Sequence, residues 1–342
     1  MGTVVVLITL LVGLLSGLTA GLAHQNISAI TTLPADRIAF DAPAPGKDLS
    51  YADSIVTERQ LQQLSAIDGV TSAEPLGISS ARLVTDGAQL TVAAFGVRSG
   101  SPLVPGDEAV DDRAVVLSPA AAGDLDLSPG DRVDLGGHEL TVAAVDGDVS
   151  FAHMPVAWVD LSVWNEIASA GAGGSAATVA ALRTTADFDE TAADRLAGTK
   201  TVARDESVSA IGSYSSENGS LQLMRGFLFV ISALVIGAFF TVWTIQRSGD
   251  IAVLQALGAT PARLVRDALG QALVVLTGGT ALGTLLAASV GAAVSGAVPF
   301  VLTPATILTP AAVMIVLGSL GAALAVRRIT SVDPLTALGS AR

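Results

Sequence analysis

The sequence predicts a membrane α-helical protein with four transmembrane helices and an α+β extracellular domain inserted between the first and second helices. The 342 residues are 51% hydrophobic and 14% charged, with a mean hydropathy of +0.61, which does not fit a soluble protein. Residues 1–35 contain no Asp, Glu, Lys or Arg, and residues 36–220 contain 28 acidic and 11 basic residues, a net charge of −17. Residues 221–342 contain 3 acidic and 7 basic residues. The chain therefore has an apolar start, an acidic water-soluble middle and an apolar end with basic loops.

Four segments are long and apolar enough to cross about 30 Å of hydrocarbon: residues 3–23, 221–245, 264–294 and 306–326. The third exceeds one crossing, so either it tilts or its Gly-rich end extends beyond the hydrocarbon. The alternative for residues 1–23 is a cleaved signal peptide ending at Gly21-Leu22-Ala23. The absence of a preceding basic region and the length of the apolar run favour a retained helix.

Arginines set the expected orientation, because short cytoplasmic loops are enriched in Lys and Arg. They lie between the second and third spans and after the fourth: Arg247, Arg263, Arg266, Arg327, Arg328 and Arg342. We therefore expect a multi-pass protein of the plasma membrane with both termini in the cytoplasm. The first helix is residues 1–23, and the acidic residues 24–220 form the extracellular domain.

The extracellular domain is predicted to contain two β-α-β units. The first comprises an extended segment over residues 37–40, a helix over 57–64 with Thr57 as N-cap, and strands over 70–84 and 90–97. The second comprises a strand over 178–182, a helix over 188–196 and a strand over 199–204. Two such units indicate ferredoxin-like halves. They flank a small β insertion at about residues 100–160, where Gly136-Gly137 predicts a hairpin.

Composition excludes several kinds of function. There are no Cys residues, the three His (His24, His138, His153) lack the spacing of a helical metal site, and no EF-hand loop is present. His138 and His153 are more typical of surface or packing positions than of ligands. Lys47 and Lys200 are the only lysines, and neither lies in a Walker A loop. We therefore expect no enzyme activity, no metal, no intrinsic cofactor and, with so acidic a domain, no nucleic-acid partner.

The loop after the second span predicts a short amphipathic cytoplasmic helix over residues 248–259. Ile251, Leu254 and Leu257 fall on one helical stripe, and Gly258 followed by Pro261 ends it. Such a helix either lies along the lipid headgroups or docks into a partner.

This loop also resembles a known family. The run from Arg247 to Pro261, with Asp250 where Glu is commoner, the basic turn from Arg263 into a Gly-rich span, and the tail from Arg327 to Leu338 resemble the FtsX-like permease domain of ABC transporters of the MacB, LolC/E and FtsX types. Residues 125–145 resemble the hairpin region of the MacB-type outer domain. Family members usually begin with a basic amphipathic helix before the first span, so either that helix was removed here or the start is misassigned.

The resemblance implies that residues 221–342 are an FtsX-like permease domain with three transmembrane helices, a coupling helix and a cytoplasmic tail. A separate ABC ATPase subunit, in two copies, would bind ATP and drive a homodimer of the permease in membrane lipid. Contact with the ATPase is expected at Arg247, Asp250, Ile251, Leu254, Leu257 and Gly258. Gly13-x3-Gly17-x3-Gly21 permits close helix approach and predicts a dimer interface in the first two spans, the alternative being a genome-wide Gly bias.

Residues 214–227 and 237–247 resemble the haem-exporting permeases of Gram-positive bacteria, which implies export of haem or another amphiphile from the membrane. Candidate haem-binding residues are Tyr214, Glu217, Met224 and Arg225, with His24 at the outer end of the first span. Glu217 and Met224 are seven residues apart, so they lie on one helix face if the second helix extends upstream. Alternatively Arg225 is a snorkelling anchor, Met224 a packing residue and Glu217 a helix N-terminal charge. Other functions are an FtsX-like signalling subunit acting on an extracellular partner, or an exporter of lipoproteins or peptides.

Overall fold

The computed structural model describes residues 2–106, 110–168, 176–247, 260–294 and 298–330, together with Gly249, Val253 and Leu257. The chain divides into two compact units. The membrane unit comprises Met1–Leu22 and Gly219–Arg342, and the inserted domain comprises Ala23–Asn218. Two long helices, α1 (Gly2–Thr31) and α7 (Gly212–Gln246), continue from one unit into the other.

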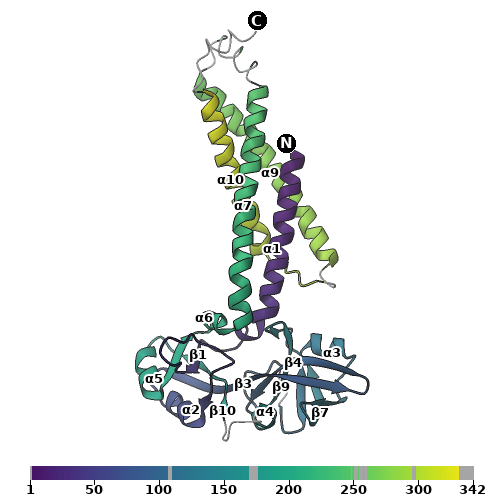
Figure 1. Cartoon of the computed structure of the whole chain (residues 1–342), viewed down its shortest axis with the longest axis vertical. Coiled ribbons are helices and arrows are strands. Elements are labelled where there is room, and N and C mark those ends of the chain that lie inside the picture. Colours follow the sequence, from purple (N-terminus) through teal and green to yellow (C-terminus); the bar gives the residue numbers. More distant parts are fainter. Residues whose placement is uncertain are drawn as a thin grey trace. The chain divides into compact units, whose positions relative to one another are not determined.

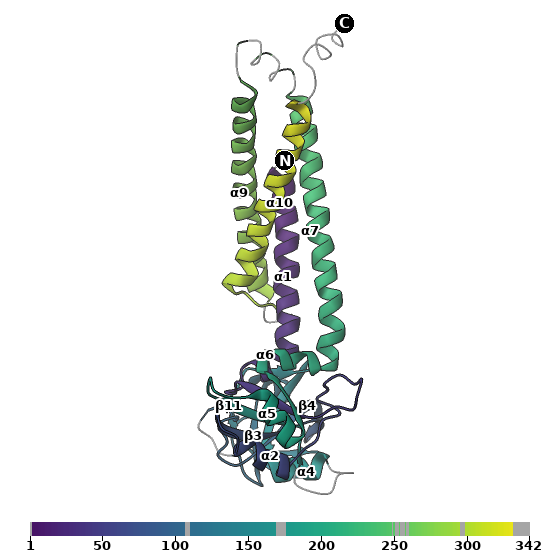
Figure 2. The same cartoon turned by 90° about the vertical axis from the view of Figure 1, so that its left-hand side faces the viewer.

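The four predicted spans are confirmed as helices α1, α7, α9 (Pro261–Val294) and α10 (Pro304–Thr330), which lie side by side (Figure 2). Each contains a stretch that is long and apolar enough to cross a membrane. The helices of the first two spans are longer than expected, because α1 continues beyond residue 23 to Thr31 and α7 begins at Gly212 rather than at residue 221. The hydropathy of the sequence predicts where a helix leaves the hydrocarbon, but not where the helix itself ends. These helices extend further because side chains such as Ile30 are buried in the core of the inserted domain.

One apolar cluster joins all four helices of the membrane unit. Each helix contributes two fully buried side chains: Val5 and Val12 from α1, Ile236 and Phe240 from α7, Ala272 and Leu276 from α9, and Met314 and Ala322 from α10. The apolar stretch of α7 is the least covered of the four, with 17% of it buried against 39% for α1. Helix α7 therefore presents the largest unpartnered apolar surface to lipid or to another chain.

The Gly13–Gly17–Gly21 stripe packs within its own chain. A Cβ at Gly13 would lie 2.8 Å from the Cβ of Ala287 on α9, one at Gly17 would overlap the ring of Phe300, and one at Gly21 would overlap the backbone of Pro299. The N–H of Val301 also donates to the carbonyl of Gly17, at 3.2 Å. The stripe is therefore covered by segments of the same chain, and a dimer interface in the first two spans stays a prediction. The pattern does indicate close backbone approach, but it does not say which backbone approaches.

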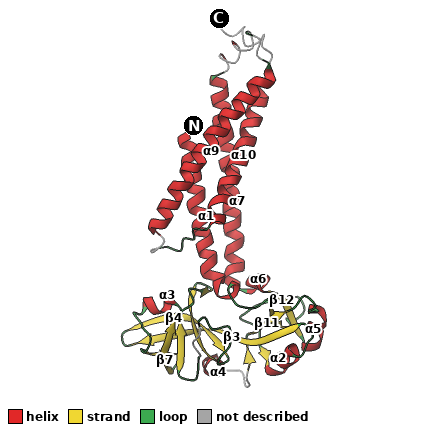
Figure 3. Ribbon diagram, turned by 180° about the vertical axis from the view of Figure 1, so that it is seen from behind, coloured by secondary structure: helices red, strands yellow, loops and turns green. Residues whose placement is uncertain are grey.

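The inserted domain is built on one 10-stranded sheet with the order β12-β1-β11-β3-β4-β9-β5-β7-β6, in which β8 pairs with β9 (Figure 3). The strands are β1 (Arg37–Asp41), β3 (Val70–Thr85), β4 (Ala88–Val97), β5 (Ala114–Leu117), β6 (Arg132–Leu135), β7 (His138–Val145), β8 (Ser150–Phe151), β9 (Met154–Asp160), β11 (Val179–Thr184) and β12 (Thr199–Ala203). A separate pair joins β2 (Val56–Thr57) to β10 (Ala176–Ala177). The 16-residue β3 pairs with β11 through its first part and with β4 through its second, so it joins both halves of the domain.

Helices cover the sheet at both ends of the domain. Helices α2 (Glu58–Ser65) and α5 (Glu190–Ala197) lie at one end, on the strands β12-β1-β11-β3, and α3 (Pro119–Asp124) lies at the other (Figure 1). The order β12-β1-β11-β3 with two crossing helices is that of a ferredoxin-like split unit. Helix α4 (Leu161–Ala168) packs Trp164 over Gly77 and Gly96. The short helix α6 (Arg204–Ser207) and a 3-10 turn, Val208–Ala210, lead into α7.

Two local predictions are confirmed. Thr57 caps α2 with a capping box: the Gln60 N–H donates to Thr57 Oγ1, and the Thr57 N–H donates to Gln60 Oε1. Gly136 and Gly137 form the loop of the β6–β7 hairpin, with φ of 61° and 94°. Both angles are positive, as a two-residue loop that matches strand twist requires.

Candidate functional site

The β8–β9 hairpin is fastened to the last turns of α1. Its loop residues Ala152 and His153 have φ of 50° and 64°, a left-handed conformation that is strained for residues other than Gly. Ala152 N–H donates to the carbonyl of Asn26 at 2.9 Å, and His153 N–H donates to that of Gln25 at 3.1 Å. Ser150 N–H also donates to Ser28 Oγ at 2.8 Å. These bonds to α1 hold the loop in its strained form.

Aromatic rings of the domain core pack against Phe151 of the hairpin. The ring of Phe151 meets those of Tyr51 and Phe95 edge to face, with centroids 5.6 and 5.8 Å apart. The Tyr51 hydroxyl lies 2.8 Å from Ser207 Oγ. Burial raises the pKa of Tyr51 well above its ordinary value, against the opposing effect of the bond to Ser207. The hairpin loop is therefore mounted on a rigid, dry core.

Four polar side chains meet beside this loop, and we call them the outer cluster: Asn26 on α1, His153 in the hairpin, and Ser213 and Glu217 on α7. His153 Nε2 donates to Glu217 Oε2 at 2.8 Å. Asn26 Nδ2 lies 3.1 Å from His153 Nε2 and donates to Glu217 Oε2 at 3.4 Å, while Ser213 Oγ donates to Asn26 Oδ1 at 2.9 Å. Asn26 is 1% exposed, but the side chains of His153 and Glu217 are 31% and 47% exposed. The cluster thus has a buried base and an ionisable pair that faces water.

The structure brings together only part of the predicted haem-binding set. Glu217 belongs to the outer cluster, and because α7 is continuous from Gly212, Glu217 and Met224 share one helix face as expected. Met224 is 59% exposed, whereas Tyr214 packs against the core of the domain. The side chain of His24 is exposed, and no hydrogen bond to it is found from the residues that the structure describes. The imidazole that reaches Glu217 belongs to His153.

Sequence reasoning missed His153 and Asn26. No ligand lies near His153 in the chain, because its partner Glu217 follows 64 residues later. The turn has no Gly or Asn to mark it, so local spacing contains no signal for this contact. The polar run His24-Gln25-Asn26, directly after an apolar stretch, is a hint in the sequence of α1. His138 takes no part in this cluster: its Nδ1 lies 3.7 Å from Glu166 Oε2.

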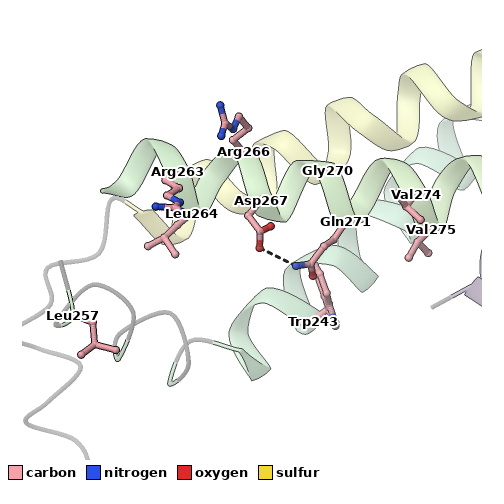
Figure 4. A pocket seen from close by; sticks show the side chains of 10 residues that line it. All are labelled: Trp243, Leu257, Arg263, Leu264, Arg266, Asp267, Gly270, Gln271, Val274 and Val275. Atoms are coloured by element: carbon pink, nitrogen blue, oxygen red, sulfur yellow. Dashed lines mark hydrogen bonds between the residues drawn. The ribbon is translucent and has the colours of Figure 1, made fainter. Parts of the chain in front are cut away.

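A second candidate site, which we call the Trp243 cleft, lies where α7 ends and α9 begins (Figure 4). It measures about 1040 Å³ and contains aromatic, cationic and aliphatic side chains. The lining residues are Trp243, Leu257, Arg263, Leu264, Arg266, Asp267, Gly270, Gln271, Val274 and Val275.

Arg247, predicted to contact the ATPase, is held at the edge of this cleft. Its guanidinium lies 4.9 Å from the centroid of the Trp243 ring, and its Nη1 donates to Gln271 Oε1 at 2.6 Å. Gln271 Nε2 in turn donates to Asp267 Oδ2 at 2.9 Å. Leu257 is 79% exposed. The remaining predicted coupling residues, Asp250, Ile251, Leu254 and Gly258, lie outside the described residues.

Among the residues that the structure describes, no three His, Asp or Glu side chains lie close enough together to hold a metal ion. The pair His153–Glu217 can therefore contribute two ligands at most from its own surroundings in the described chain.

Comparison with protein families gives two matches that together span most of the chain. Residues 1–197 match the MacB-like periplasmic core domain, and residues 223–334 match the FtsX-like permease C-terminal domain.

Similar proteins of known name span the same length. The chain is 26% identical to a protein of Staphylococcus haemolyticus named as the hemin transport system permease HrtB, over 98% of this chain and 95% of the relative. It is 22% identical to the protein of that name in Staphylococcus epidermidis, over 98% and 93%. It is 23% identical to an ABC transporter permease of Mycobacterium tuberculosis, over 95% and 90%.

Solved structures similar to the chain are outer domains. The periplasmic region of MacB from Actinobacillus actinomycetemcomitans is 17% identical, covering 54% of this chain and 94% of that one, with a TM-score of 0.37. The extracellular domain of the transporter YknZ from Gram-positive bacteria is 18% identical, covering 49% and 99%, with a TM-score of 0.36.

Proposed function

The chain belongs to the FtsX/MacB-type permeases of ABC transporters, and on that premise we propose that it is the membrane subunit of an exporter of haem or a similar flat amphiphile. The substrate is proposed from the similarity, along 98% of the chain, to permeases named for hemin transport. As a permease the chain is a non-enzymatic transporter component whose partner is an ATPase. Haem as the substrate is the proposal.

We propose that two permeases and two ATPase subunits form the working unit, and that the segment 248–259 is the contact with the ATPase. Its support is the sequence pattern: Ile251, Leu254 and Leu257 have the spacing of an apolar helical stripe that could dock into a partner. Arg247, fixed between Trp243 and Gln271, would anchor the segment to both α7 and α9. The uncovered face of α7 is the surface we assign to the permease dimer.

The arginine distribution supports a cytoplasmic location for both termini and for residues 248–259. Single cysteines introduced into this Cys-free chain test it directly. Asp131→Cys should react with a membrane-impermeant thiol reagent from outside, and Gly249→Cys only after the membrane is opened. The reverse pattern would overturn the topology.

We propose that haem approaches from the outer leaflet and is held by the α7 face that bears Glu217 and Met224. Two helical turns separate them, about 10 Å at 1.5 Å per residue, which is comparable to the width of a porphyrin. Met thioether and His imidazole are ligands of haem iron, and Arg225 can pair with a propionate. We include His24 as a candidate ligand. Glu217 Oε2 is bound to His153, which leaves Glu217 Oε1 for contact with the substrate.

Haem titration of the purified permease is the decisive experiment. The wild type should give a saturable shift of the Soret band, and Glu217→Ala, Met224→Ala and His24→Ala should each weaken it. Leu223→Ala is the control, because Leu223 is as exposed on α7 as its neighbour Met224 but offers no ligand. No saturable shift in the wild type, or normal haem tolerance in cells lacking the gene, would refute haem as substrate.

A signalling role is the second candidate. It is favoured by the hydrogen bonds that fasten the hairpin to α1 and by the cluster that joins α7 to the same hairpin, since this joint can pass a helix movement into the inserted domain. Deletion of the gene would then alter an extracellular activity of the cell while leaving haem tolerance unchanged.

A further inference from the structure

We propose that the Trp243 cleft binds the headgroup of an anionic phospholipid, with the phosphate on Arg263 and Arg266 and an acyl chain along α9. No site residue predicted for substrate binding lies in this cleft, and the proposal is independent of what the permease exports. It depends on charge, on membrane depth and on the division of the cleft into a polar and an apolar end.

The first argument is charge. Two guanidinium groups, Arg263 and Arg266, line the cleft, and Arg247 lies at its edge. In the described part of the chain none of the three forms an ion pair with a carboxylate, and the one acidic lining residue, Asp267, accepts a bond from Gln271. A phosphodiester supplies the missing negative charge, and guanidinium groups bind it through paired hydrogen bonds.

The second argument is depth. The apolar run of α7 ends at Ile245, two residues beyond Trp243, and on α9 the last charged residue before the apolar run is Asp267, so the cleft lies where both helices leave the hydrocarbon. Trp side chains concentrate at this level, beside lipid headgroups. A basic pocket between transmembrane helices at this depth is the kind of site that binds anionic headgroups.

The third argument is the lining. From Arg263 to Val275 the cleft changes along α9 from cationic to aliphatic, and Val274 is 71% exposed in a helix that continues into the membrane. Figure 4 shows Arg263 and Arg266 near the start of α9 and the two valines further along it. This sequence of surfaces matches a phospholipid, whose anionic head is followed by hydrocarbon. A free ion would not need the apolar end.

Trp243 is a built-in reporter for the test. The chain has three Trp, and the other two, Trp158 and Trp164, are buried in the inserted domain at 3% and 7% exposure. The full-length permease is placed in phosphatidylcholine nanodiscs that contain increasing amounts of phosphatidylglycerol brominated on its acyl chains. Brominated lipid should quench Trp emission at a much lower mole fraction when it is phosphatidylglycerol than when it is phosphatidylcholine.

The double variant Arg263→Gln/Arg266→Gln should lose this preference by roughly 30-fold, since each basic side chain near the surface contributes about a fivefold factor. Arg263→Lys/Arg266→Lys should retain most of it, which separates charge loss from misfolding. The control Arg327→Gln/Arg328→Gln removes the same charge from the end of α10 and should leave the preference intact.

Several outcomes would overturn the proposal. Equal quenching by the two brominated lipids would exclude a selective site, and equal loss in the α10 control would reduce the effect to general surface charge. Displacement of the lipid by millimolar inorganic phosphate would indicate a free-anion site. Loss of quenching on adding the ATPase subunit would assign the cleft to that protein contact instead.

Discussion

Gly17→Ala is the sharpest test of how the membrane unit is packed. The added Cβ would overlap the ring of Phe300, on a segment whose Val301 N–H donates to the Gly17 carbonyl. Alanine is the smallest change that adds a Cβ, so any effect comes from this one atom and not from a new side-chain shape. Gly278→Ala is the matched control, because a Cβ at Gly278 on α9 meets no atom within 4 Å.

The expected cost follows from three contributions. Overpacking costs about 1–3 kcal/mol, and loss of the Val301 hydrogen bond costs about 1 kcal/mol more. The higher helix propensity of alanine stabilises the helix by about 1 kcal/mol. For Gly278→Ala this is the only one of the three contributions that applies. Gly17→Ala should therefore lower the free energy of unfolding by about 2 kcal/mol. In a unit of this size that corresponds to a fall of about 4–8 °C in the unfolding midpoint.

Two measurements check this. The first is the thermal midpoint of the detergent-purified permease, compared between Gly17→Ala and Gly278→Ala. The second is the rate at which a thiol at Val301→Cys is labelled, which should rise only in the Gly17→Ala background, because the segment 298–303 is displaced from α1. If both values equal those of the control while the yield of crosslinked dimer falls, the stripe is an interface between chains and this reasoning is refuted.

Three further predictions concern the inserted domain. Asn26→Ala removes the hydrogen bonds to Ser213 and Glu217, so it should lower stability by about 2 kcal/mol and raise the proteolysis rate of the hairpin. The pKa of Tyr51 is raised in the folded state above its ordinary 10.0, so its contribution is complete below that pH and is lost as pH rises beyond it, by about 1.4 kcal/mol per pH unit. In a Tyr214→Phe background, tyrosinate absorbance should therefore appear only with unfolding. Thr57→Ala removes a capping box and should cost about 1 kcal/mol, read as a lower urea midpoint.

Each of these predictions has a clear contrary result. Unchanged hairpin proteolysis in Asn26→Ala would mean that the outer cluster does not hold the loop. Tyrosinate formation in the folded Tyr214→Phe protein would mean that Tyr51 is reached by water. A urea midpoint in Thr57→Ala equal to that of the wild type would mean that α2 is held by its packing through Leu61 and Leu64 alone.

Elements with a local cause could be predicted from the sequence. The four spans follow from unbroken apolar runs, because hydrocarbon cannot satisfy an exposed backbone or a charge. The cap at Thr57 and the Gly136-Gly137 loop follow from interactions within three residues of each other. The chemistry of these signals is complete in a short window, so no distant partner is needed to interpret them.

Contacts between distant segments were decided only by the tertiary structure. The sequence predicts a strand over residues 70–84, but not that its first part pairs with β11 and its second part with β4, because a strand's own pattern does not identify its neighbours. The Gly13–Gly21 stripe likewise indicates a close approach but not that the approaching segment is Pro299–Val301 of the same chain.

The outer cluster shows this division most clearly. Sequence placed Glu217 and Met224 on one helix face, because helical spacing depends only on residue number. It did not bring His153 to Glu217, since that contact requires the sheet to hold a strained hairpin against the end of α1. Side-chain periodicity is a property of one segment. The partner of a polar side chain is instead set by the fold that packs three segments together.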